Sequence, residues 1–212
     1  ISDNCGIYAL PHVVEKAAEE FSETPKMLAV AEKLVGPYVW GRYDMIVLPK
    51  AFPFGGMENP RLTFLTPTVI AGDKSLVSLV AHELAHSWSG NLVTNGSWDD
   101  FWLNEGITVY LERRIIEEIK GKEFAAMHRH NGMVDLNSTI QELGSESKDV
   151  HLKLDLQGRD PDDGMTDIAY EKGAQFMEYI ESVVGRESMD IMLSEYFTAF
   201  SFKTINTENF LV

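Results

Sequence analysis

Two histidines, His82 and His86, are four positions apart in this sequence and could act together in chemistry. On an α-helix, side chains with this spacing lie on one face about one turn apart, so two imidazole rings there can bind one metal ion. Glu83 lies one residue off that face, where its carboxylate could reach a water molecule on the ion without replacing a ligand. The alternative interpretation is a pair of solvated histidines on an exposed helix.

Glu105, 19 residues after His86, is the expected third ligand and would arrive from the next helix. It lies within the apolar residues 102–106, which indicates a buried position, and a buried carboxylate needs a cation nearby. The pattern His-Glu-x-x-His is known from zinc peptidases, and two histidines with one glutamate leave zinc a fourth position for water. Zinc makes that water acidic enough to attack near neutral pH, with Glu83 as the base that takes its proton.

Two other side chains could assist this chemistry. Tyr170 carries a phenol near the expected start of a helix and could stabilise the oxyanion that forms when water attacks a peptide carbonyl. A packed tyrosine is the simpler interpretation on chemical grounds alone. Glu112, two turns after Glu105, could orient a ligand histidine, and a surface role fits its position equally well.

The composition limits the classes of function. The 212 residues are 44% hydrophobic with a formal net charge of -15, which argues against binding to nucleic acids or anionic membrane surfaces. Cys5 is the only cysteine, so no internal disulfide can form. No apolar stretch approaches the roughly 18 residues of a membrane span, and we expect a cytoplasmic protein with no membrane partner. Because the sequence begins with Ile1 rather than Met, we expect a piece of a longer protein.

The hydrophobic pattern changes along the chain from strands to helices. Strands are expected at residues 43–48 and 61–65, and residues 7–10 are expected to end another strand, whereas glycine and proline exclude a helix from 52–60. From residue 75 the apolar spacing is helical through the histidine pair, with Asp73 or Ser75 as the expected N-cap. This order predicts an α+β fold, with a small mixed-sheet lobe followed by a mainly helical lobe. Further helices are expected at residues 12–21, 26–35, 98–119, 123–141, 167–184 and 187–200.

Three parts of the sequence together resemble a known enzyme family. Gly-Gly-Met-Glu-Asn at residues 55–59, His-Glu-Leu-Ala-His at 82–86, and Glu105 resemble the zinc aminopeptidases of the gluzincin class, which include aminopeptidase N, aminopeptidase B and leukotriene A4 hydrolase. Longer segments at residues 36–41, 71–76, 90–95 and 101–111 look most like the leukotriene A4 hydrolase branch. The resemblance extends from about Phe21 to the C-terminus.

The resemblance implies a thermolysin-like zinc peptidase domain that covers residues 1–212 and binds one zinc ion. It also implies that two parts of the full-length enzyme, an N-terminal β-rich domain and a C-terminal helical domain, lie outside this sequence. Those domains are the expected partners of the catalytic domain, and peptides with a free N-terminus are the expected substrates.

The resemblance also assigns the substrate-binding segment. In that family the glutamate that corresponds to Glu58 binds the free α-amino group of the substrate. The backbone of Gly55 and Gly56 is expected to align the peptide, since glycine allows close approach of a backbone. Met57 and Asn59 complete the segment. A turn carboxylate without a ligand is the alternative for Glu58.

Two further positions follow from the same resemblance, and one departs from it. Tyr170 corresponds to the oxyanion tyrosine of the family, and Asp162 corresponds to a pocket aspartate of the leukotriene A4 hydrolase branch. Met165 stands where that branch carries a second tyrosine, which argues against hydrolysis of a lipid epoxide. Aminopeptidase activity does not depend on that tyrosine.

The expected function is therefore zinc-dependent removal of N-terminal residues from peptides. A thermolysin-like endopeptidase would share the zinc ligands and Glu83, but Glu58 favours an enzyme that selects a free amine. A bifunctional epoxide hydrolase and aminopeptidase is a further alternative. A metal-stabilised peptide-binding domain without turnover is the alternative outside enzymes, and the intact base Glu83 argues against it.

Overall fold

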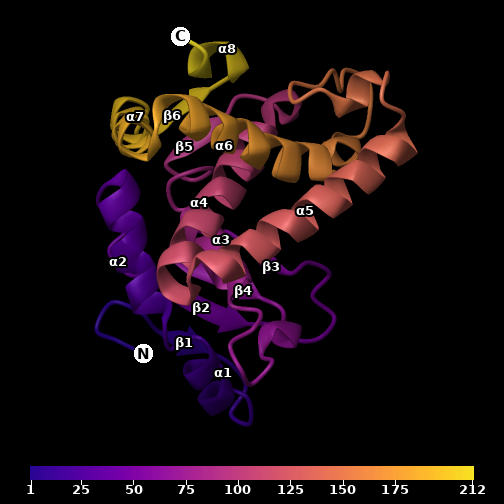
Figure 1. The fold of residues 1–212 in the computed structure, drawn as a ribbon. Coiled ribbons are helices and arrows are strands. Elements are labelled where there is room, and N and C mark those ends of the chain that lie inside the picture. The colour runs from indigo at the N-terminus through magenta and orange to yellow at the C-terminus, as the bar shows by residue number, and fades with distance from the viewer.

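The computed structural model describes residues 1–212, with a small sheet at one end of the molecule and a larger group of helices beyond it (Figure 1). The sheet has the strand order β1-β2-β4-β3, in which β3 is an antiparallel edge strand and the other pairs are parallel. A second sheet pairs two short parallel strands, β5 and β6. The strands are β1 (Ile7–Tyr8), β2 (Asp44–Val47), β3 (Gly56–Met57), β4 (Leu62–Leu65), β5 (Val93–Asn95) and β6 (Lys203–Ile205).

Helices make up most of the rest of the chain, and α4 is central among them. α4 contacts α2, α3, α5 and α6, and every residue from 102 to 111 is buried. The first half of this helix is buried on all faces, including its polar residues Asn104 and Glu105, as expected of a helix enclosed by others. The helices are α1 (Val14–Glu20), α2 (Thr24–Val35), α3 (Ser78–Ala85), α4 (Trp102–Lys120), α5 (Lys122–Leu143), α6 (Gly173–Val184), α7 (Arg186–Ala199) and α8 (Thr207–Phe210).

The predicted α+β architecture is confirmed, and the long elements lie close to their expected bounds. The strands expected at 43–48 and 61–65 are β2 and β4, and the expected helices are α1 to α7. Three short strands were not predicted: β3, inside the glycine- and proline-rich segment 52–60, and the pair β5 and β6. Two or three residues are too few to show an alternating hydrophobic pattern, so their pairing depends on neighbours distant in sequence.

The start of α3 differs from the prediction. Neither Asp73 nor Ser75 caps the helix, which begins at Ser78 after the N-cap residue Val77. The carboxylate of Asp73 instead accepts a hydrogen bond from the backbone N–H of Ser75 at 2.9 Å, in a turn where Lys74 has a φ of 59°. Aspartate often closes local turns of this kind in competition with helix capping. The helical pattern of the sequence therefore begins about one turn before the helix itself.

Two glycines allow α4 to lie directly against the start of α6. A Cβ on Gly106 would be 2.6 Å from Cα of Gly173, and a Cβ on Gly173 would be 2.7 Å from Cα of Gly106. A side chain at either position would push the two backbones apart. This contact fixes the segment just before α6 beside the residues at the start of α4.

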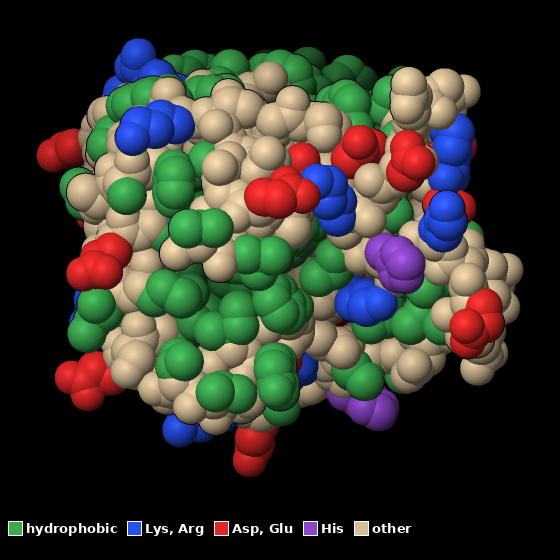
Figure 2. All heavy atoms as spheres, turned by 90° about the horizontal axis from the view of Figure 1, so that it is seen from above, with side chains coloured by type: hydrophobic (Ala, Val, Ile, Leu, Met, Phe, Trp, Pro, Cys, Tyr) green, Lys and Arg blue, Asp and Glu red, His purple; other side chains and the backbone are tan.

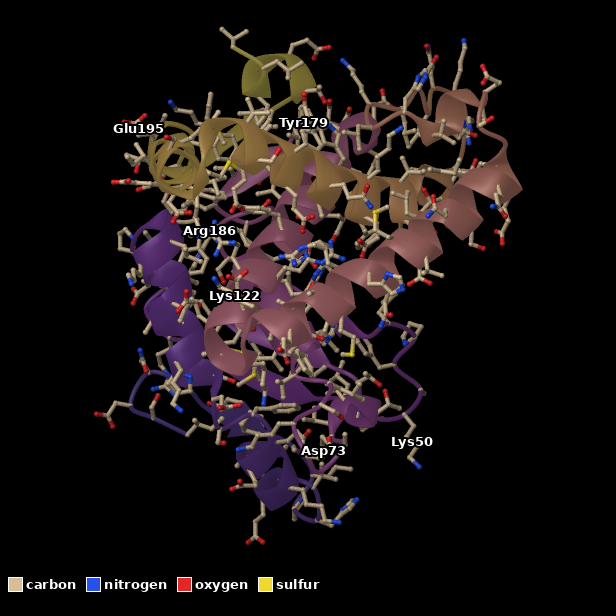
Figure 3. All side chains as sticks on the ribbon, in the orientation of Figure 1. Lys50, Asp73, Lys122, Tyr179, Arg186 and Glu195 are labelled. Carbon is tan, nitrogen blue, oxygen red and sulfur yellow. The ribbon has the colours of Figure 1, made fainter.

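The helical end of the molecule carries many exposed apolar side chains. Seen from above in Figure 2, this end presents a broad apolar area with charged groups around it. Exposed apolar residues of its elements include Tyr179, Val183 and Ile191. Tyr179 is labelled in Figure 3, with Lys50 and Asp73 on loops at the opposite end. None of the helices has both the length and the apolar character needed to cross a membrane.

Candidate active site

α3 and α4 bring the three predicted metal ligands together. The Nε2 atoms of His82 and His86 are 3.1 Å apart, and Oε2 of Glu105 lies 3.3 Å from the first and 3.4 Å from the second. The histidines face the same way because they are one turn apart, and Glu105 stands in the first turn of α4, which packs against α3. The three side chains form one cluster, here called the triad.

The second ring nitrogen of each histidine has its own partner. Nδ1 of His82 lies 3.1 Å from Oε2 of Glu112, and Nδ1 of His86 lies 2.9 Å from the carbonyl oxygen of Ser89. The hydroxyl of Thr108 is 3.1 Å from the same Nδ1 of His86. A proton on each Nδ1 can be donated to these oxygens, which leaves both Nε2 atoms available as metal ligands. Glu112 therefore has the geometry of a carboxylate that orients a ligand histidine.

The triad fits a zinc ion. Bonds of about 2.0–2.1 Å in a tetrahedral arrangement place ligand atoms roughly 3.3–3.4 Å apart, close to the separations of the three atoms here. Oε2 of Glu105 is buried and has no hydrogen-bond partner within the chain. Burial works to raise the pKa of Glu105, but His86 and His82 lower it to about 2, so the cluster favours a positive charge at its centre. Two nitrogens and one carboxylate oxygen are a common donor set of catalytic zinc.

Glu83 points from α3 toward β3. Its carboxylate lies so close to the backbone of Gly56 that a Cβ there would be 2.2 Å from Oε1 of Glu83. Only glycine permits this close approach, because any side chain at position 56 would collide with the carboxylate of Glu83. Gly56 also lines the cavity. Glu83 is 5% exposed, its Oε2 has no hydrogen-bond partner, and burial raises its pKa to about 7. A buried carboxylate with a free oxygen beside the triad is placed to accept a proton.

Glu58 follows β3 and faces the same space as Glu83. Ligand atoms of Glu58, Glu83 and His86 lie within 4.8 Å of one another. Nδ2 of Asn104 donates a hydrogen bond to Oε1 of Glu58 at 3.4 Å, and Nδ2 of Asn91 donates to the carbonyl oxygen of Glu58 at 2.7 Å. The two asparagines thus hold the side chain and the backbone of Glu58. Two carboxylates this close together favour a cationic group between them.

Tyr170 reaches the site from a π-helical turn, Ile168–Lys172, that precedes α6. Its ring is nearly parallel to that of His82, with the centroids 6.3 Å apart, and it meets the ring of Phe101 edge-on at 5.9 Å. Burial and the nearby carboxylates raise the pKa of Tyr170 well above its usual value. The phenol therefore keeps its proton and stays a hydrogen-bond donor.

These side chains surround one cavity of about 440 Å³. Every predicted metal-ligating and catalytic residue contributes to its lining, and most of the predicted substrate-binding segment does as well. The lining residues from those predictions are Gly55, Gly56, Met57, Glu58, His82, Glu83, His86, Glu105 and Tyr170.

Two predicted substrate-binding residues lie outside this lining. Asn59 follows Glu58, and its backbone N–H donates a hydrogen bond to the carbonyl oxygen of Met57 at 2.9 Å. Asp162 is exposed in the short 3-10 turn Pro161–Gly164. A contact between Asp162 and the substrate stays a prediction of the family resemblance.

Other lining residues were not predicted from the sequence. Phe54, Leu79, Trp98 and Phe101 form apolar walls of the cavity, and Asn104 holds Glu58. The apolar residues have no distinguishing pattern, because the same types at the same spacing also build helix cores. For Asn104 the only signal was its place beside Glu105 in an otherwise apolar segment.

Comparison with known proteins identifies relatives of this architecture. Residues 19–212 match the peptidase family M1 domain. The chain is 46% identical over 203 residues to a leukotriene A-4 hydrolase of Xenopus laevis, covering 95% of the chain and 33% of that protein. It is also 46% identical over 189 residues to a leucine aminopeptidase 2 of Aspergillus terreus, covering 89% and 31%. The chain thus spans about a third of the length of these relatives.

Solved structures agree with the sequence comparison. The native leukotriene A4 hydrolase of Saccharomyces cerevisiae matches with a TM-score of 0.94 and 41% identity, over 99% of this chain and 34% of that one. An M1 zinc metallopeptidase of Deinococcus radiodurans matches with a TM-score of 0.70 and 26% identity, over 89% and 39%. These relatives share the fold of this chain. The chain belongs to peptidase family M1.

Proposed function

We propose that residues 1–212 form the catalytic domain of a zinc-dependent aminopeptidase, which removes residues from the free N-terminus of peptides. Glu58 carries the proposal, because its carboxylate shares one cavity with the triad and with Glu83. A carboxylate in that place selects an ammonium group over the neutral amide of a continuing chain. Relatives named leucine aminopeptidase support the same activity.

Each catalytic side chain has a separate task in the proposed reaction. When bound by His82, His86 and Glu105, zinc supplies a Lewis acid that acidifies water and polarises the peptide carbonyl. Glu83 takes a proton from the attacking water and passes it to the departing amine. Tyr170 donates a hydrogen bond to the oxyanion of the tetrahedral intermediate.

The substrate is expected to lie along β3. This strand is at the edge of the sheet and pairs only with β4, so its outer backbone groups can bind an extended peptide. Gly55 and Gly56 leave room for that backbone, and Glu58 ends the segment with a carboxylate for the α-amino group. The asparagines at positions 91 and 104 keep Glu58 in place for this contact.

Glu58 and Glu83 also argue against the alternatives. An endopeptidase would need the chain to continue past the position that Glu58 occupies. A peptide-binding domain without turnover would have no use for the buried, unpartnered carboxylate oxygen of Glu83 beside the triad. Met165 lines the cavity where an epoxide hydrolase of this branch is expected to carry a tyrosine, and a thioether cannot donate a hydrogen bond.

We expect the purified full-length protein to hold about one zinc ion per chain, bound by the triad. Removal of the metal with a chelator should lower the melting temperature, because bound zinc stabilises the native state by about 4 kcal/mol at a free concentration about 1,000 times its dissociation constant. Metal analysis and thermal unfolding before and after zinc is added back measure both effects. His86→Ala should lose the metal, whereas His130→Ala, at an exposed position of α5, should retain it. A folded protein that takes up no zinc would contradict the proposal.

Glu58 should decide which peptides are cleaved. The full-length enzyme is expected to remove residues one at a time from free peptides and to refuse the same peptides after N-acetylation. Glu58→Ala removes a charge-assisted hydrogen bond, so the KM for free peptides should rise roughly 10–100-fold while the zinc content stays unchanged. Glu58→Gln is the matched variant, since it keeps the shape and loses only the charge. Internal cleavage of blocked peptides by the wild-type enzyme would replace this proposal with the endopeptidase.

A further inference from the structure

The direction of the Tyr170 hydroxyl depends on the backbone that carries it. The ring packs against His82 and Phe101, and its backbone belongs to the π-helical turn Ile168–Lys172. A π-helical turn holds one residue more than an α-helical turn, so a return to α-helical spacing would rotate Tyr170 away from the triad. Something must therefore hold the turn in its wider form.

The residue next to Tyr170 makes a strong contact with α4. Nη2 of Arg113 donates a hydrogen bond to Oε2 of Glu171 at 2.6 Å, and Arg113 is 4% exposed. Arg113 follows Glu112, whose carboxylate lies 3.1 Å from Nδ1 of His82. Adjacent residues of α4 thus contact the ligand histidine on one side and the turn that bears Tyr170 on the other.

α5 closes over this ion pair. A Cβ on Gly132 would be 2.1 Å from Oε2 of Glu171 and 2.5 Å from Nη2 of Arg113, so the backbone of α5 rests directly on the pair. One further contact joins α5 to the turn, where the Thr139 hydroxyl donates to the carboxylate of Asp167 at 2.7 Å. The turn is therefore held between α4 and α5.

We propose that Arg113 and Glu171 are positioning residues for Tyr170, and that their partly buried ion pair beneath Gly132 keeps the π-helical turn in the form that aims the phenol at the reacting carbonyl. The inference rests on the proposed oxyanion role of Tyr170. Buried ion pairs contribute little net stability, but they can specify one conformation among several of similar energy. Neither residue lines the cavity, so neither is placed to touch the substrate directly.

Glu171→Ala in the full-length enzyme should lower kcat by about 10–100-fold with KM nearly unchanged, since a displacement of about 1 Å can cost about 10²-fold in rate. Affinity for a phosphinic peptide that mimics the tetrahedral intermediate should fall by a similar factor. Glu171→Gln keeps an oxygen that can accept from Arg113 and should restore most of kcat. When Glu171→Ala is added to Tyr170→Phe, kcat should fall by less than about threefold further. The hydroxyl group that Glu171 is proposed to position is already absent from that variant.

Asp190→Ala is the matched control. Asp190 pairs at 2.8 Å with Arg114, the neighbouring buried arginine of α4, and this pair faces α7 rather than the turn. Arg186, labelled in Figure 3, stands at the start of α7 and links Glu117 and Glu181 at 2.7 and 2.8 Å. We expect Asp190→Ala to lower the melting temperature and to leave kcat within about twofold.

Gly132→Ala tests the same inference without leaving a charge unpaired. The added methyl group should displace Glu171, so kcat should fall even though alanine favours the helix more than glycine does. The positioning role alone would be overturned by either of two results. One is an equal loss of kcat in Glu171→Ala and Asp190→Ala. The other is that Glu171→Ala lowers kcat in the Tyr170→Phe variant by as much as it does in the wild-type enzyme. An unchanged kcat in Tyr170→Phe would overturn the oxyanion role and this inference with it.

Discussion

Replacement of Glu83 with glutamine is expected to lower kcat by at least ~10²-fold while the zinc stays bound. Glutamine has nearly the same shape as glutamate, so it can occupy the tight space beside Gly56. It cannot accept a proton near neutral pH, and the attacking water then has no base. Turnover of aminoacyl amides and the zinc content of the full-length enzyme measure the two effects separately.

Glu20→Gln provides the control for this result. Glu20 is also buried, at 2% exposure, and accepts backbone hydrogen bonds from Gly72 and Lys74 at 2.7 and 2.8 Å, outside the lining of the cavity. Its neutralisation should cost stability and leave kcat near the wild-type value. Wild-type turnover in Glu83→Gln would remove Glu83 from the proposed mechanism, whatever the zinc content.

Tyr170→Phe should lower kcat by roughly 10²–10³-fold with little change in KM, as for the loss of one oxyanion donor. The variant keeps the ring and its packing against His82 and Phe101, so only the hydrogen bond to the oxyanion is lost. Steady-state kinetics of the full-length enzyme with free peptides separate the two constants.

Tyr43→Phe is the matched loss of a hydroxyl elsewhere. The hydroxyl of Tyr43 accepts a hydrogen bond from Thr63 at 2.9 Å within the sheet lobe, and its removal should leave kcat unchanged. A rise in KM alone in Tyr170→Phe would instead make Tyr170 a residue that binds the ground state of the substrate.

The clustering of the three candidate metal ligands could be predicted from the sequence because local geometry determines their main contact. His82 and His86 share one face of a helix wherever that helix lies in the fold. The apolar neighbours of Glu105 indicate that its side chain is buried. Tyr170 could not be derived in this way, since 65 residues separate it from Glu105. Only the resemblance to a family indicated that the fold brings the two together.

The residues that hold the histidines and Glu58 in place could not be predicted from the sequence, for a different reason. Ser89, Thr108 and Asn104 act through contacts between α3, α4 and the segment after β3. Residues of these types are common on loops and helices, and their spacing carries no period. The edge strand β3 was missed because it exists only through its pairing with β4. Tertiary contacts, and not local preference, define these parts of the site.

The contact between Gly106 and Gly173 has a consequence for how the protein unfolds on heating. Gly106 follows Glu105, and Gly173 closes the turn that carries Tyr170, so a backbone contact sets the separation between the segments that carry Glu105 and Tyr170. Two backbones in direct contact have no side chains between them, so changes of rotamer cannot gradually widen the distance between them. The two backbone segments can separate only when α4 and α6 part as whole helices. We therefore expect this backbone contact to be lost on heating together with the native fold, in a single cooperative event.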